Sequence, residues 1–291
     1  MTELITHLAD ISDRYDVVFC DLWGCLHNGK APFPAAVAAL QAFRAKGGRV
    51  VLMTNAPRPR MAVERQLAGM GLPRDAWDII TASGDAAQAA MLQGAVGRRV
   101  FHIGAEKDMP FFDEITPENQ PLAGAPVQRV GMLEAEGVVC TGLADDQTET
   151  PEDYRTTLLL AKSRGLPMLC ANPDIVVDMG ERRVWCAGAL AEDFVNMGGT
   201  VSYYGKPHPP IYDLARRLLN LTEGARVLVI GDGIAADIRG AEGQGLDALF
   251  IPGGIAAAHF GPDPARPDKA ALEAWLAQQR LAPRWSMPFL A

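Results

Sequence analysis

The sequence has no apolar run long enough to cross a membrane and no stretch rich in lysine and arginine. A spanning helix needs about 18 or more consecutive apolar residues, and none of the apolar runs in these 291 residues reaches that length. The first twenty residues carry Glu3, Asp10, Asp13 and Asp16, so we expect neither a signal peptide nor a membrane partner. The net charge of −8 argues against nucleic acid and favours a small molecule as the main partner.

Cysteine is scarce, and its spacing follows no pattern of disulfides or zinc sites. The five cysteines are Cys20, Cys25, Cys140, Cys170 and Cys186. An odd number without paired spacing is typical of reduced thiols, and we therefore expect a cytoplasmic protein. We expect these thiols to be buried as small core residues. Internal repeats and low-complexity segments are also missing from the sequence.

Alternating strand and helix patterns predict an α/β fold built on a doubly wound parallel sheet. Continuous apolar runs are typical of strands that are buried on both faces, as parallel strands are. The predicted strands are residues 16–20, 49–53, 200–205, 226–231 and 248–252, and the predicted helices are residues 1–15, 32–46, 61–71 and 268–279. With 48% hydrophobic residues, the chain can form two moderate domains.

Between residues 84 and 198 the alternation restarts, with strands and helices of its own. Strands are predicted at residues 99–104, 137–142 and 166–171, helices at 85–92, 151–164 and 188–197, and a loop at 110–130. This segment separates the first two polar strand ends, described next, from the last two. We therefore expect a core formed by residues 1–83 and 199–291, with residues 84–198 as an inserted α/β domain.

Polar side chains follow four of the predicted core strands. They are Asp21, the pair Thr54 and Asn55, Lys206, and Asp232 with Asp237 one helical turn later. Because the carboxyl ends of parallel strands meet at one edge of a sheet, we expect these groups to converge. Carboxylates suit a divalent metal such as Mg²⁺, whereas lysine and threonine can bind the oxygens of a phosphoryl group.

These motifs resemble the four motifs of the haloacid dehalogenase superfamily of phosphatases, in the same order. The matching residues are Asp21 with its glycine turn, Thr54-Asn55, Gly205-Lys206-Pro207 and the stretch from Gly231 to Asp237. The long insertion resembles the cap domain of subclass IIA, which includes sugar, nucleotide and aryl phosphatases. The resemblance implies a Rossmann-like core with a cap, and an Mg²⁺-dependent phosphatase-like hydrolase that acts on a small phosphorylated metabolite.

The resemblance also implies a role for each motif residue. Asp21 would be the nucleophile that forms an aspartyl-phosphate, and Thr54 and Lys206 would hold the phosphoryl group. Mg²⁺ would be bound by Asp21, the backbone carbonyl of Trp23 and Asp232, with Asp237 supporting the metal or its water shell. Substrate contacts are expected from Asn55 and from the cap residues Asn172 and Asp174, which follow a buried strand in an Asn-Pro-Asp turn; a plain turn is the alternative for these two cap residues.

Trp23 departs from the phosphatase pattern, in which a second aspartate two residues after the nucleophile protonates the leaving group and later activates water. Tryptophan can do neither, and general acid-base catalysis is typically worth about 10² to 10⁴ in rate. Three alternatives stay open: a phosphatase for substrates with good leaving groups, a phosphoryl-ligand-binding pseudoenzyme with little turnover, and a dehalogenase-like hydrolase. His27 either replaces the proton donor or is an ordinary loop histidine.

Other polar and aromatic residues near the motifs have two interpretations each. Arg58 and Arg60 either reach an anionic substrate or start a helix. Asp145 and Asp146 either contact substrate or form a plain turn. In the tail, Trp285, Met287 and Phe289 would cover either the core or a contact in a homo-oligomer.

Overall fold

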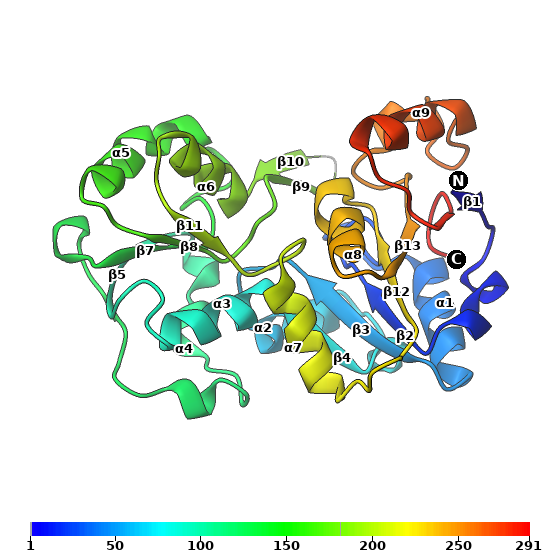
Figure 1. Cartoon of the computed structure of the whole chain (residues 1–291), viewed down its shortest axis with the longest axis horizontal. Coiled ribbons are helices and arrows are strands. Elements are labelled where there is room, and N and C mark those ends of the chain that lie inside the picture. Colours follow the sequence, from blue (N-terminus) through cyan, green and yellow to red (C-terminus); the bar gives the residue numbers. More distant parts are fainter. Residues whose placement is uncertain (1, 181) are drawn as a thin grey trace.

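The computed structural model describes residues 2–180 and 182–291. Within these residues it contains two parallel sheets and one antiparallel hairpin (Figure 1). The larger sheet has the strand order β1-β14-β13-β12-β2-β3-β4, and the smaller sheet has the order β11-β8-β7-β5-β6. Every pairing within the two sheets is parallel. The predicted α/β class, with a Rossmann-like core, is confirmed.

Helices cover both faces of the larger sheet, as its apolar strands require. Its strands are β1 (Glu3–Leu4), β2 (Val17–Cys20), β3 (Arg49–Thr54), β4 (Ile79–Ala82), β12 (Val227–Gly231), β13 (Asp247–Phe250) and β14 (Trp285–Ser286). One face packs on α1 (Pro34–Ala45) and α2 (Arg60–Gly69), and the other on α7 (Pro209–Leu219), α8 (Arg239–Gly243) and α9 (Lys269–Gln279). Val18 and Cys20 of β2 contribute to the first core, and Val17 and Phe19 contribute to the second. Successive side chains of β2 point to opposite faces of the sheet, and both faces are buried.

The smaller sheet is built from the segment 84–198 together with β11, which follows it, and has cores of its own. Its strands are β5 (Arg99–Ile103), β6 (Gln128–Arg129), β7 (Gly137–Cys140), β8 (Met168–Cys170) and β11 (Val201–Tyr203). Helices α5 (Arg155–Ser163) and α6 (Ala187–Asn196) pack on one face, and α3 (Ser83–Leu92) and α4 (Pro110–Asp113) on the other. The hairpin of β9 (Val176–Met179) and β10 (Arg182–Trp185) lies between the two sheets in Figure 1.

The prediction of a helix over residues 1–15 is wrong, because the chain forms β1 and two 3-10 turns there. Glu3 pairs with Trp285 and Leu4 with Ser286, so the backbone hydrogen bonds that a helix would make are made across the chain. The 3-10 turns at Leu8–Asp10 and Ser12–Arg14 then lead into β2. Residue 1 lies outside the described residues.

Two further predictions need correction. The segment 110–130, predicted as loop, contains the short helix α4, a 3-10 turn at Gln120–Leu122 and the edge strand β6. The strand before Lys206 was expected in the larger sheet, but β11 pairs with β8 in the smaller one. An apolar strand pattern indicates that a segment pairs in a sheet, but it does not indicate which of two sheets the segment joins. Lys206 therefore reaches the larger sheet from a strand of the smaller one.

All five cysteines are free thiols and buried, as predicted. Trp285 and Met287 of the tail are buried in the core of the larger sheet, whereas Phe289 is 43% exposed. The first two tail residues therefore cover the core. None of the helices in the described part of the chain has the length and apolar content needed to cross a membrane.

Candidate active site

Lys206 joins two carboxylates at the end of the larger sheet. Asp21 directly follows β2, and Lys206 Nζ lies 2.5 Å from its Oδ1 and 2.7 Å from Asp237 Oδ1. Asp237 belongs to a π-helical turn, Ile234–Ile238, and its other oxygen accepts the amide of Gly233 at 3.1 Å. The lysine is 3% exposed, so this ion pair network is shielded from solvent. The predicted convergence of Asp21, Lys206 and Asp237 is present.

Asn55 fixes the position of Lys206. Its Oδ1 accepts the backbone N–H of Lys206 at 2.7 Å, and its Nδ2 donates to the backbone carbonyl of the same residue at 3.0 Å. Nδ2 also donates to Asp174 Oδ1 at 2.8 Å, and the amide of Asp174 donates to Asn172 Oδ1 at 3.0 Å. The buried amide of Asn55 thus connects the strand end after β3 with the Asn-Pro-Asp turn. Thr54 beside it is 2% exposed and lines the same cavity.

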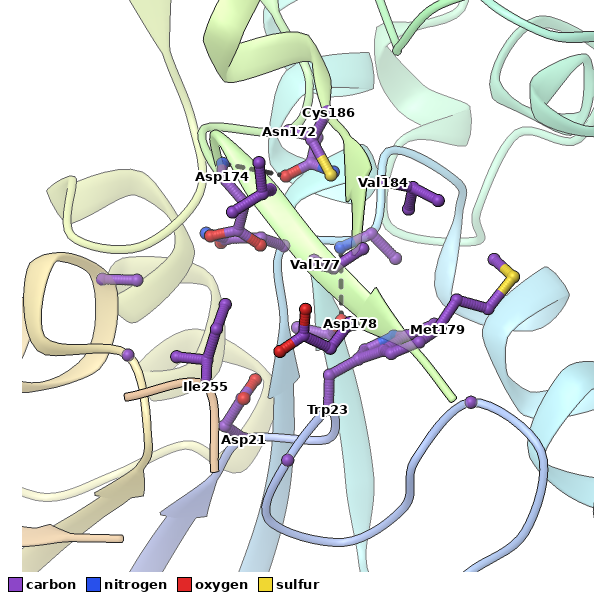
Figure 2. Close-up of a pocket in the computed structure, with 18 of the residues that line it drawn as sticks. Asp21, Trp23, Asn172, Asp174, Val177, Asp178, Met179, Val184, Cys186 and Ile255 are labelled. Atoms are coloured by element: carbon purple, nitrogen blue, oxygen red, sulfur yellow. Dashed lines mark hydrogen bonds between the residues drawn. The ribbon is translucent and has the colours of Figure 1, made fainter. Parts of the chain in front are cut away.

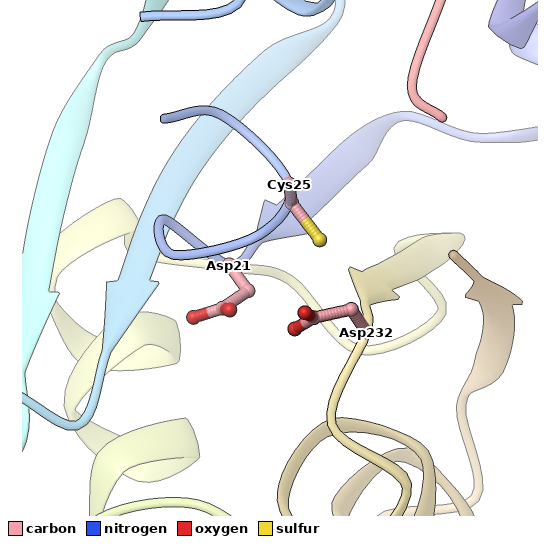
Figure 3. Close-up of side chains that lie close together, drawn as sticks. All are labelled: Asp21, Cys25 and Asp232. Atoms are coloured by element: carbon pink, nitrogen blue, oxygen red, sulfur yellow. The ribbon is translucent and has the colours of Figure 1, made fainter. Parts of the chain in front are cut away.

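Asp232 faces Asp21 from the end of β12 (Figure 3). One oxygen from each carboxylate and Sγ of Cys25 all lie within 4.8 Å of one another. The amide of Ile255 donates to Asp232 Oδ2 at 2.7 Å. Gly24 has φ +76°, and a Cβ on it would meet Asp232 Oδ2 at 2.0 Å, so only glycine fits beside this carboxylate. The glycine turn after β2 therefore makes room for Asp232.

Carboxyl groups outnumber cationic groups among the buried residues of this site. Burial raises the pKa of Asp21, against the opposing effect of Lys206. Burial and the charges of Asp21 and Asp237 raise the pKa of Asp232 well above its usual range. Burial, opposed by Lys206, raises the pKa of Asp237 to about 7. A bound cation would lower all three values, because it stabilises the ionised carboxylates. Burial also raises the pKa of Cys25, which therefore stays a thiol.

These groups open into a cavity of about 430 Å³ between the two sheets. The polar wall contains the site residues described above together with Arg58, Lys107 and Asp146. The apolar wall contains Trp23, Phe33, Val176, Val177, Met179, Val184, Trp185 and Phe289. Figure 2 shows that Val177, Asp178 and Met179 approach from β9, opposite Asp21 and Trp23. The volume fits a small metabolite.

Trp23 and His27 pack against each other in the turn after β2. Their ring centroids are 5.2 Å apart in an edge-to-face arrangement. His27 is 1% exposed, its Nδ1 accepts the amide of Gly29 at 3.0 Å, and burial lowers its pKa to about 4. It is therefore a neutral, packed ring that supports Trp23, and it does not line the cavity. Of the two interpretations of His27, the structure supports the ordinary loop histidine.

Comparison with known proteins identifies the family. A haloacid dehalogenase-like hydrolase profile matches residues 18–116, and a HAD-hydrolase-like profile matches residues 203–273. A crystal structure of a haloacid dehalogenase-like hydrolase from Brucella suis is 42% identical to this chain, with a TM-score of 0.84, and the alignment covers 99% of this chain and all of the other. The chain belongs to the haloacid dehalogenase-like hydrolase family.

Characterised relatives of this haloacid dehalogenase-like hydrolase are more distant. The D-glycerol 3-phosphate phosphatase of Mycobacterium tuberculosis is 25% identical over 249 residues, which are 85% of this chain. The chain spans 66% of the length of that relative. A crystal structure of the Mycobacterium tuberculosis glycerol phosphate phosphatase in complex with magnesium is 24% identical, with a TM-score of 0.63, covering 88% of this chain and 74% of the other. At that identity the structural likeness shows a shared fold.

Most residues that sequence reasoning selected in this hydrolase lie at the cavity. Those lining it are Asp21, Trp23, Thr54, Asn55, Asn172, Asp174, Lys206, Asp232 and Asp237. The pairs Arg58–Arg60 and Asp145–Asp146 were given two interpretations each, and one member of each pair, Arg58 and Asp146, lines the cavity. Arg60 instead donates its amide to Asp85 and forms an ion pair with Glu118. Asp145 forms hydrogen bonds within its own turn.

The hairpin of β9 and β10 was missed by sequence reasoning, although a signal for it exists. Residues 176–185 have β-branched and aromatic residues on both sides of Gly180, which has φ +65°. Two short extended runs around such a glycine are typical of a hairpin. Because the hairpin was not predicted, Asp178 on β9 was not recognised as a residue that lines the cavity.

Proposed function

We propose that this hydrolase is an Mg²⁺-dependent phosphatase that acts on a small phosphorylated metabolite through an aspartyl-phosphate on Asp21. The observation that carries the proposal is the buried contact of Lys206 with Asp21 and Asp237 beside Asp232, at the floor of a small cavity. The phosphatase names of its relatives support it. A cytoplasmic location, and the absence of nucleic acid and membrane partners, stay predictions.

In this proposal Asp21 is the nucleophile. A carboxylate oxygen of Asp21 attacks phosphorus, the bond from phosphorus to the ester oxygen breaks, and the leaving group departs with the electron pair. The Lys206 ammonium and the Thr54 hydroxyl bind the phosphoryl oxygens, where negative charge is concentrated. Asp237 and Asn55 position Lys206 from its side chain and its backbone respectively.

The donor atoms fit a magnesium ion. Carboxylate oxygens are the ligands that Mg²⁺ prefers, and Gly24 leaves the space that Asp232 occupies beside Asp21. Asp21, Asp232 and the backbone carbonyl of Trp23 would hold the ion, and Asp237 would support its water shell. When bound, Mg²⁺ would neutralise charge on the phosphoryl oxygens. The magnesium complex of the mycobacterial relative supports this choice of metal.

We propose that the inserted domain, residues 84–198, acts as the cap that selects the substrate. Asn172 and Asp174 reach the cavity from the turn after β8. Trp23 offers no proton to a leaving group, so substrates with good leaving groups, such as aryl or acyl phosphates, suit the site best. The wall of apolar side chains around Trp23 suits an aromatic leaving group.

The test is hydrolysis of 4-nitrophenyl phosphate by the purified protein with Mg²⁺ and after chelation with EDTA. We expect nitrophenolate release that needs Mg²⁺ and that Asp21→Asn abolishes. A protein that binds phosphate but releases no nitrophenolate would be a pseudoenzyme, and metal-independent halide release from 2-haloacids would identify a dehalogenase. Either result rejects the proposal.

A further inference from the structure

Asp178 and Arg183 form an ion pair across the hairpin of β9 and β10. The two residues are direct partners in the antiparallel register. Arg183 Nε donates to Asp178 Oδ1 at 2.8 Å, and Nη2 donates to Oδ2 at 2.9 Å. Because opposed residues in a hairpin point to the same face, the pairing fixes the direction of the Asp178 carboxylate.

The hairpin is attached at two points to loops that follow strands of the larger sheet. The amide of Gly180 donates to the carbonyl of Asn28 at 3.1 Å, in the turn that follows Asp21. Arg183 Nη2 donates to the carbonyl of Ile255 at 3.4 Å, and the amide of the same Ile255 donates to Asp232. The hairpin therefore spans the cavity, and a short chain of hydrogen bonds links Asp178 to one of the proposed metal ligands.

Asp178 lines the cavity from β9 of the hairpin. In Figure 2 its carboxylate points from β9 toward the side of the cavity where Asp21 lies, and both residues line the same cavity. Phosphoryl transfer is roughly in line, so the leaving group departs opposite the attacking Asp21 oxygen. The water that later attacks the aspartyl-phosphate comes from that same side, which the hairpin covers.

We propose that Asp178 is the general base for hydrolysis of the aspartyl-phosphate, a function that Trp23 cannot perform. In this step the water oxygen bonds to phosphorus, the water proton passes to the Asp178 carboxylate, and the bond from phosphorus to Asp21 breaks. The electron pair of that bond restores the Asp21 carboxylate, and inorganic phosphate leaves. Asp178 then releases the proton to solvent. This inference rests on the proposed phosphatase function.

The ion pair with Arg183 is compatible with this role. The Asp178 side chain is 39% exposed and the Arg183 side chain is 55% exposed, so water reaches this bidentate pair. Arg183 orients the Asp178 carboxylate and is a positioning residue. Asp108, Asp146 and Asp174 also line the cavity from the inserted segment. Asp108 and Asp146 form ion pairs with the cavity residues Arg58 and Lys107, and Asp174 accepts a hydrogen bond from Asn55. The contacts of Asp174 connect the cap to Lys206.

The experiment is stopped-flow mixing of 4-nitrophenyl phosphate and Mg²⁺ with the full chain, comparing the unmodified protein with Asp178→Asn. Without the base, the first step proceeds and the second stalls. We expect a burst of one equivalent of nitrophenolate, followed by steady-state release slower than in the unmodified protein by about 10²-fold or more. Intact-mass analysis of acid-quenched Asp178→Asn should show one phosphoryl group per chain.

Three further variants make the result specific. Asp213→Asn removes an aspartate that forms an exposed ion pair with Arg216 on α7, and should behave like the unmodified protein. Asp178→Glu should restore part of the steady-state rate and remove the burst. Asp174→Asn should show no burst, because its loss weakens the cap contact and slows both steps together.

Several results would overturn the inference. They are steady-state turnover of Asp178→Asn at the unmodified rate, equal slowing of its burst and steady state, or a burst in Asp174→Asn. If the unmodified protein releases no nitrophenolate at all, the proposed function fails and this inference fails with it. If the unmodified protein turns over but Asp178→Asn shows no burst, the role of Asp178 is rejected and the proposed function is not.

Discussion

Protonation of His27 should destabilise the folded protein in mild acid. The ring is buried, and its Nδ1 already accepts the amide of Gly29, so a proton on this atom would remove a hydrogen bond and bury a charge. The folded pKa of about 4 lies below the unfolded value of 6.5. The unfolded chain therefore binds more protons between these values. Stability from the neutral ring is complete above pH 6.5 and is lost as the pH falls toward 4.

The magnitude follows from the pKa difference. Each unit of pKa difference corresponds to about 1.4 kcal/mol, so lowering the pH from about 7.5 to about 4.5 should cost about 2.5 kcal/mol of unfolding free energy through His27 alone. Other groups titrate in the same range, so the quantity to measure is the difference between the unmodified protein and a variant without this titration. His27→Asn suits this purpose, because its Oδ1 can still accept the Gly29 amide.

The assay is urea unfolding of both proteins, followed by tryptophan fluorescence, at the two pH values. At the higher pH the variant should be less stable, because it loses the packing of the imidazole on Trp23. At the lower pH this difference should shrink by about 2.5 kcal/mol or reverse. A difference that stays the same at both pH values would refute the reasoning, since it would mean that His27 keeps an ordinary pKa.

Three other predictions concern the same site. Trp23→Asp should narrow the gap between the rates for aryl and alkyl phosphates, which kcat/KM for both substrate classes would measure; equal rates in the unmodified protein would contradict this. Gly29→Ala should destabilise the fold by about 1–3 kcal/mol, because Gly29 has φ +83° and a Cβ there would meet Trp23 at 2.4 Å. The control is Gly47→Ala: Gly47 has φ +91° but no neighbouring atom within 4 Å of an added Cβ, so this variant should show only the cost of backbone strain. Asn55→Ala should leave a buried Lys206 amide unpaired and cost about 1–3 kcal/mol in urea unfolding; no loss would show that water replaces the amide side chain.

The strand ends were the most predictable part of the site. A buried parallel strand is a continuous apolar run, and its carboxyl end lies at a known edge of the sheet. That reasoning brought Asp21, Thr54 and Asp232 together without knowledge of the pairing. The same reasoning placed Lys206 at this edge on a wrong sheet assignment, because β11 belongs to the smaller sheet; the family motif around Lys206 supported its place independently.

Some regular elements were missed, because prolines precede them or because they are short. Helix α7 was overlooked because Pro209 and Pro210 precede its apolar positions, although proline is well tolerated in a first helical turn. β4 has only four residues and directly precedes α3, so its strand period is too short to stand out. The role proposed for Asp178 depends on contacts of Arg183 with Ile255 and of Gly180 with Asn28, which are distant in sequence, and no local pattern contains that information.

The pairing of β1 with β14 has a consequence for how the chain folds during synthesis. The smaller sheet uses strands from residues 99 to 203 only, so it can form as soon as this segment has left the ribosome. The larger sheet has β14 between β13 and β1, so it is completed only when residue 286 has emerged. Until then the edges of β1 and β13 stay unpaired, and pairings this distant in sequence form slowly. The inserted segment is therefore expected to be folded while the larger sheet, whose strand ends we propose to bind Mg²⁺ and phosphate, is still incomplete.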